Sequence, residues 1–403
     1  MACQHCGAAL AATVTASGTG AVCLECGVSQ PAAVSQFTTQ PLDWGWEDQA
    51  QTEQKAKRAE PPLGTHALSF TGTAGEFFHI WIVNVFLTVV TLGIYNAWAK
   101  VRTRQYFYAN THLAGHSFDY LANPINILKG NLVVGAGLII YNLTDAFAPL
   151  WSLLIVGLFA LVFPFLAYQS LRFRTRYSAY RNIRFHFHGT LGESYRVFLL
   201  IPFFVLCSLG LLFPYMLSRQ KEYAFGRFAF GTTRSKFYGG PGKFFKVYLL
   251  AALLTVGFST ALFFVFDSFL TSYSYDTGSL GIYGATALMY LVSVTFFSVI
   301  QEYIYVNIAN YCWAETWLGK VSFKSTLRLR DLAWIRLTNL FAMLLSFGLL
   351  IPWAKVRRTR YVVENLAVVM REDDLDAFVA DESNYQNSLG DVATNALDIE
   401  IGL

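Results

Sequence analysis

The segment TLGIYNAWAK at residues 91–100 recurs as SLGLLFPYM at 208–216 and as SFGLLIPWAK at 346–355. Each copy has a small hydroxyl residue, a glycine, and a proline or alanine before an aromatic residue, at fixed offsets. Glycine and proline interrupt helices, and an aromatic residue beside lysine is typical of a membrane–water interface. The repeat therefore predicts three interrupted apolar helices. The breaks are expected at Gly93, Gly210 and Gly348.

The overall composition is that of a membrane protein. Of the 403 residues, 54% are apolar and only 14% are charged, about half the charge content of a soluble domain. The mean hydropathy is +0.40. A net charge of +4 is too small to indicate nucleic acid, so no nucleic-acid partner is expected. The N-terminus has no basic region followed by an apolar core, so we expect it to stay in the cytoplasm.

The placement of basic residues predicts which apolar stretches cross the membrane. Basic clusters follow the first, third, fourth and seventh stretches, whereas the connections 142–149 and 267–280 hold no lysine or arginine. Because basic loops stay in the cytoplasm, the second, third, fifth and sixth stretches should cross fully. The first, fourth and seventh should be re-entrant or interfacial; the alternative is seven crossings. The stretches are 77–98, 127–145, 149–169, 196–217, 245–268, 281–304 and 332–354.

Short alternating segments lie between the apolar stretches. RFHFHG at 184–189, RFAFG at 227–231 and LSFTG at 68–72 have the two-residue period of strands. The predicted fold class is thus an all-α polytopic membrane protein with internal repeats and short cytoplasmic β-strands, preceded by a small zinc ribbon.

Two CxxCG motifs near the N-terminus predict that ribbon. Cys3 and Cys6 form the first motif, and Cys23 and Cys26 form the second. Four thiolates suit tetrahedral Zn²⁺ at a closed structural site. A ribbon this small should fold only around its metal. It is a candidate docking module for a cytoplasmic protein partner.

Composition divides the chain into four regions. The zinc ribbon covers residues 1–30, and a polar, proline-containing linker covers 31–67. The repeat-containing membrane domain covers 68–370, and an acidic tail covers 371–403. Both termini are expected in the cytoplasm.

Polar residues at membrane depth are candidate membrane-site residues because burying them is costly. Asn84 and Glu302 are the candidates here, together with the three break glycines. Glu302 has two interpretations, a proton relay or an ion pair with a neighbouring arginine. Basic residues after the apolar segments are expected to bind anionic lipid head groups. They are Lys100, Arg102, Arg104, Arg174, Arg176, Lys355, Arg358 and Arg360.

The motif WAKVRTR at 98–104, after LGIY at 92–95 and repeated as IPWAKVR at 351–357, resembles the YjgN-like family of bacterial inner-membrane proteins. The resemblance covers the membrane domain and implies a bacterial inner membrane. It supplies no reaction and no catalytic residues, and the zinc ribbon is an addition to it.

No nucleophile motif, zinc-protease motif or phosphate-binding loop is present in the sequence. We therefore expect a non-enzymatic protein. A membrane scaffold or sensor would recruit a partner through the ribbon and the basic face. The alternative, a transporter or channel for a small solute or lipid, predicts a continuous cavity from the three glycine breaks toward Asn84 or Glu302.

Overall fold

The computed structural model describes residues 10–15, 18–23, 29–31, 64–147, 149–273 and 279–371. The chain divides into two units, Met1–Glu60 and Pro61–Leu403, and each is described by itself.

The first unit contains a small antiparallel sheet of three strands. They are β1 (Leu10–Thr15), β2 (Gly18–Cys23) and β3 (Ser29–Pro31), in that order. Leu10, four residues after the first CxxC motif, pairs with Cys23, the first cysteine of the second. Cys3, Cys6 and Cys26 lie outside the described residues. The register therefore brings together the two strand ends that adjoin the motifs, and the zinc site itself stays a prediction.

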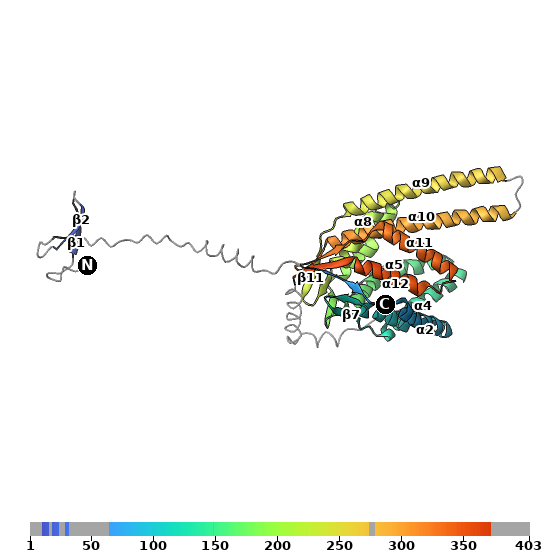
Figure 1. Cartoon of the computed structure of the whole chain (residues 1–403), viewed down its shortest axis with the longest axis horizontal. Helices are drawn as coiled ribbons and strands as arrows, with labels where there is room; N and C mark the ends of the chain where they lie inside the picture. Colours follow the sequence, from blue (N-terminus) through green and yellow to red (C-terminus); the bar gives the residue numbers. More distant parts are fainter. Residues whose placement is uncertain are drawn as a thin grey trace. The chain divides into compact units, whose positions relative to one another are not determined.

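Four helices of the second unit are long and apolar enough to cross a membrane. This number equals the number of full crossings expected from the charge pattern. Their candidate spans are Pro124–Phe147, Leu150–Arg176, Pro241–Phe269 and Tyr283–Ala314. The helices are α4 (Pro124–Phe147), α5 (Pro149–Arg176), α9 (Pro241–Tyr273) and α10 (Ser279–Ala314). They form two hairpins, α4–α5 and α9–α10, and α9 and α10 extend side by side away from the other helices (Figure 1).

Each of the three repeated segments is a helix that breaks and reverses. At every break a residue with φ near +50° precedes a glycine with φ of +87° to +92°. Left-handed backbone of this kind closes a helix, and glycine adopts it without a Cβ penalty. The first hairpin pairs α2 (Ala74–Val90) with α3 (Asn96–Ala109). In the second, α6 (Leu191–Tyr195), the π-helical segment η1 (Arg196–Leu200) and α7 (Ile201–Cys207) form the outgoing arm, and α8 (Phe213–Phe225) returns. The third pairs α11 (Leu329–Leu345) with α12 (Ile351–Glu364).

Hydrogen bonds at the three breaks are alike. The glycine N–H donates to a carbonyl five residues earlier, at 2.8 Å for Gly93 and Gly348 and 2.9 Å for Gly210. The hydroxyl of Thr91, Ser208 or Ser346 then accepts from the N–H of the residue just before the returning helix at 3.0–3.2 Å. The small hydroxyl residue of the repeat, which is the C-cap of the first helix, thus holds the turn that leads into the second helix.

Short strands join the helical hairpins into a closed ring. The described strands form an 11-stranded antiparallel sheet whose two end strands, β4 and β5, are consecutive in the chain. Leu68, the residue between β4 and β5, donates its N–H to the Leu366 carbonyl of β14 at 3.0 Å. The strands are β4 (Gly64–Ala67), β5 (Ser69–Phe70), β6 (Thr111–Leu113), β7 (His116–Tyr120), β8 (Ser178–Tyr180), β9 (Ile183–Phe187), β10 (Phe228–Phe230), β11 (Thr233–Phe237), β12 (Thr316–Leu318), β13 (Val321–Ser325) and β14 (Leu366–Met370).

The ring extends one expectation. The three alternating segments are strands as predicted, but they belong to β9, β10 and β5 of a closed sheet, so an all-α description of the fold is incomplete. The first strand of the ring begins at Gly64. Around the ring, broken hairpins alternate with the two long hairpins, and all helices leave from the same end of it (Figure 1).

Candidate functional site: a basic pocket at the central broken hairpin

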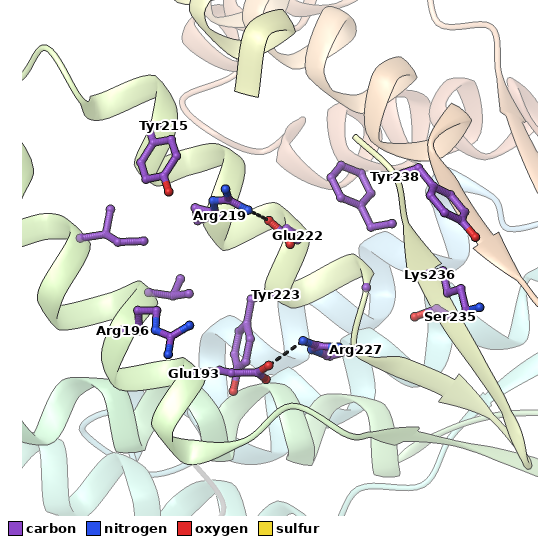
Figure 2. A pocket seen from close by; sticks show the side chains of 14 residues that line it. Glu193, Arg196, Tyr215, Arg219, Glu222, Tyr223, Arg227, Ser235, Lys236 and Tyr238 are labelled. Carbon is purple, nitrogen blue, oxygen red and sulfur yellow. Dashed lines mark hydrogen bonds and ion pairs between the residues drawn. The ribbon is translucent and has the colours of Figure 1, made fainter. Parts of the chain in front are cut away.

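A pocket of about 540 Å³ lies beside the central broken hairpin. Its walls come from α6 and η1 on one side, α8 on the other, and β11 with the residues that follow it (Figure 2). The Ser194 hydroxyl donates to the Pro164 carbonyl of α5 at 2.7 Å and is fully buried. This bond attaches the pocket to a candidate membrane-spanning helix.

Local sequence places one acidic group at the start of α6. Thr190 and Glu193 form a capping box, in which the Thr190 hydroxyl accepts from the Glu193 N–H at 3.2 Å and the Glu193 carboxylate accepts from the Thr190 N–H at 3.1 Å. The other carboxylate oxygen of Glu193 pairs with Arg227 at 2.6 Å. A helix N-terminus and an arginine together hold this carboxylate.

The pocket has more positive than negative charge. Arg219 pairs with Glu222 at 2.5 Å and lies over the Tyr215 ring, 5.0 Å from its centre. Arg196 and Lys236 also line the pocket, and neither forms an ion pair with any carboxylate in the described part of the chain. Two cations therefore remain for an anionic ligand, with Arg196 facing the Glu193–Arg227 pair in Figure 2.

Tyr223 forms the floor between the two ion pairs and is 4% exposed. Its hydroxyl donates to the Thr190 carbonyl at 3.0 Å. Burial is the main cause that raises the pKa of Tyr223 to about 12, and the nearby Glu193 carboxylate contributes to the increase. The group is thus a neutral hydrogen-bond donor at physiological pH and not a candidate base.

In the other two broken hairpins, the tyrosine at the position equivalent to Tyr223 contacts an acidic side chain. Tyr106 lies 3.3 Å from Glu76, and Tyr361 lies 3.0 Å from Asp331. In each hairpin the acid and the tyrosine are 30 residues apart, as Glu193 and Tyr223 are. This spacing is a sequence signal that could have located the central pocket, whose lining residues were not among the predicted site residues.

The three break glycines lie where their helices reverse direction. The residue before each glycine is almost fully exposed, at 94% for Leu92 and Leu209 and 98% for Phe347. The tips are therefore apolar and project away from the packed parts of their hairpins.

The two polar candidates have different surroundings. Asn84 is buried in α2, and neither of its amide atoms has a hydrogen-bond partner in the described residues. Glu302 is 1% exposed and pairs with Arg358, through a bond of 3.0 Å and a second contact, and with Arg336 at 3.1 Å. The arginine partner that the sequence offered as one interpretation is present.

Several basic residues expected at lipid head groups contact the protein itself. Arg104 donates to the Tyr120 hydroxyl at 2.6 Å, and Arg360 donates to the Gly72 carbonyl at 2.9 Å. Lys355 lies over the rings of Phe77 and Phe107. Arg358 pairs with Glu302, and Arg176 is half-buried. The remaining residues of that set, Lys100, Arg102 and Arg174, are exposed.

Four of the pockets in the described part of the chain lie at the central hairpin, inside the ring, between α9 and α10, and beside α12. Their lining residues do not include the three break glycines, Asn84 or Glu302.

Comparison with known proteins identifies the family. Residues 65–396 match the family described as "Bacterial protein of unknown function (DUF898)". The chain belongs to the DUF898 family. The match begins within β4 of the ring, and the family description names no activity.

Relatives of this DUF898 chain include two proteins named "Inner membrane protein YjgN". The protein of Salmonella typhimurium is 30% identical over 148 residues, which are 36% of this chain and 37% of that relative. The protein of Escherichia coli K12 is 28% identical over 157 residues, 38% of each chain. The match spans under two fifths of these relatives, and no solved structure matches the chain. The resemblance seen in the WAKVR motif is confirmed.

Proposed function

We propose that this protein is a non-enzymatic scaffold or sensor of the bacterial inner membrane, and that its central pocket holds an anionic lipid head group. The unpaired cations Arg196 and Lys236 carry the proposal. The four apolar helices support a membrane location, and the relatives named as inner membrane proteins support the bacterial inner membrane. By the charge pattern, the pocket faces the cytoplasm.

The proposed head-group site suits a phosphate. Two fixed ion pairs keep Arg219 and Arg227 in place, so the free cations lie in a preorganised frame. Both cations are exposed and can reach a ligand, and arginine and lysine form charge-assisted hydrogen bonds with phosphate oxygens. The alternative, a transporter or channel for a small solute or lipid, requires a cavity from the breaks to Asn84 or Glu302, and none of the four pockets above is lined by these residues.

The test uses the full chain in nanodiscs of zwitterionic lipid containing a small fraction of phosphatidylglycerol. Native mass spectrometry counts the phosphatidylglycerol that stays bound. The variant R196Q/K236Q should lose a retained anionic lipid, with affinity falling roughly tenfold or more. The control K320Q/K324Q removes the same charge from the ring turn and strand β13. Equal retention by the two variants would refute the pocket as the site.

The zinc ribbon is the second part of the proposed function. Cys3, Cys6, Cys23 and Cys26 would hold Zn²⁺, which would supply the folding energy of the ribbon. The ribbon would then present a surface to a cytoplasmic protein. Metal analysis of the purified chain should give one zinc per protein, and C3S/C23S should lose it. A chain that retains zinc after both substitutions would contradict this assignment.

A further inference from the structure

The β-ring encloses a cavity that the lipid head-group proposal does not use. Its volume is about 200 Å³, larger than a cavity of ~150 Å³ that stays dry and binds benzene. The inward side chains of most strands form the wall, together with Trp313 of α10. Arg227 lines the basic pocket and the next residue, Phe228, lines this cavity, so the two sites adjoin each other at the start of β10.

The exposed wall of the cavity is entirely apolar. The one hydroxyl among the residues that line it, on Tyr180, donates to the Leu113 carbonyl at 2.7 Å and is buried. Water entering this space would find no hydrogen-bond partner, and a buried water needs at least two. The chemistry of the wall therefore selects a hydrocarbon.

The cavity is closed at one end and accessible at the other. Leu113, Phe230 and Val321, which adjoin the hairpin turns, are 3–7% exposed. Phe228 and Leu366, at the helix-side ends of β10 and β14, also line the cavity and are only partly buried against the same cluster. The opening thus lies at the end of the ring from which all the helices leave.

That end adjoins the membrane-spanning part of the protein. Trp313, in the cavity wall, stands at the last turn of the candidate span Tyr283–Ala314. Five-residue strands such as β13 and β14 are ~16 Å long at 3.3 Å per residue. This depth suits an extended chain that enters from the side of the bilayer.

We propose that the β-ring binds the hydrocarbon chain of a membrane lipid, inserted from its helix-bearing end. An acyl chain could come from a free fatty acid or from an intact phospholipid, and the chemistry of recognition is shared.

The experiment uses photoreactive probes with the full chain in nanodiscs. One arm uses palmitate with a diazirine on its chain, and the other uses phosphatidylglycerol carrying the same chain. After irradiation, peptides are mapped by mass spectrometry. We expect cross-links at Trp313, Phe323 or Leu366, in addition to those on the lipid-facing helices. The arm that labels the ring identifies the source of the chain.

A matched pair of variants tests the cavity itself. Val368 and Val369 are neighbours in β14; Val368 lines the cavity and Val369 does not. V368F fills the space, so ring labelling should fall roughly tenfold, while helix labelling stays as a check that the protein is folded. V369F should label as the unaltered protein does. Absence of ring labelling in both arms, or full ring labelling of folded V368F, would overturn the proposal.

Discussion

Replacing Glu302 tests the buried ion cluster that joins the last spanning helix to the last broken hairpin. The carboxylate, 1% exposed on α10, pairs with Arg336 of α11 and Arg358 of α12, whose side chains are 40% and 30% exposed. Removing one partner of a buried pair costs about 3–5 kcal/mol. Since both guanidinium groups still reach solvent, we expect E302Q to cost about 3 kcal/mol, at the lower end of that range.

Replacing the two arginine partners of Glu302 should lower the free energy of unfolding by different amounts. R358M removes two contacts with the carboxylate, whereas R336M removes one such contact and an exposed bond of 2.8 Å to Gln301. We therefore expect about 2–3 kcal/mol for R358M and about 1 kcal/mol for R336M. The double variant E302L/R358M should regain part of the loss, because two apolar groups leave no unpaired charge on this pair.

Thermal unfolding of the purified protein in one detergent, followed by tryptophan fluorescence, provides the measurement. At roughly 2 °C per kcal/mol, E302Q should lower the midpoint by about 6 °C. Two results would refute the reasoning: E302Q unfolding at the midpoint of the unaltered protein, or R336M costing more than R358M. Either would mean that the carboxylate is not held by Arg358 as the structure has it.

Three further predictions concern the repeats and the ring, and each is measured by the same unfolding assay. N339A should lower the free energy of unfolding by about 2 kcal/mol, because Asn339 donates to the Ala354 carbonyl and accepts from Arg357. Asn84 is at the equivalent position of the first broken hairpin but has no hydrogen-bond partner in the described residues, so N84A should be nearly neutral. G348A should cost about 1–3 kcal/mol through its left-handed φ of +87°, and a stable G348A would show that the break tolerates a side chain. Partial burial, followed by the charges of neighbouring residues, lowers the pKa of His188. The unfolded chain therefore takes up the proton first, so stability should decline slightly as the pH falls below about 6.5, and H188N should remove that decline.

Local sequence patterns were sufficient for the helical elements. Period, length and hydropathy located the four long apolar helices, because a spanning helix satisfies its own backbone within one continuous segment. The recurring Ser or Thr, glycine and proline located the three breaks for the same reason, since cap and turn chemistry acts over five residues or fewer.

Contacts between distant segments were beyond the reach of those patterns. The bond from Leu68 to Leu366 closes the ring, and no local signal indicates that strands so far apart in sequence will pair. Glu302 acquires its arginines from two other helices, so its surroundings follow from packing and not from its neighbours in the chain. The basic pocket and the apolar cavity are likewise built from several elements. The sequence by itself determined which segments are apolar helices, breaks and strands, because those depend on residues close in the chain. Only the tertiary structure decided that the strands close into a ring with one basic and one apolar site, because that depends on which faces meet.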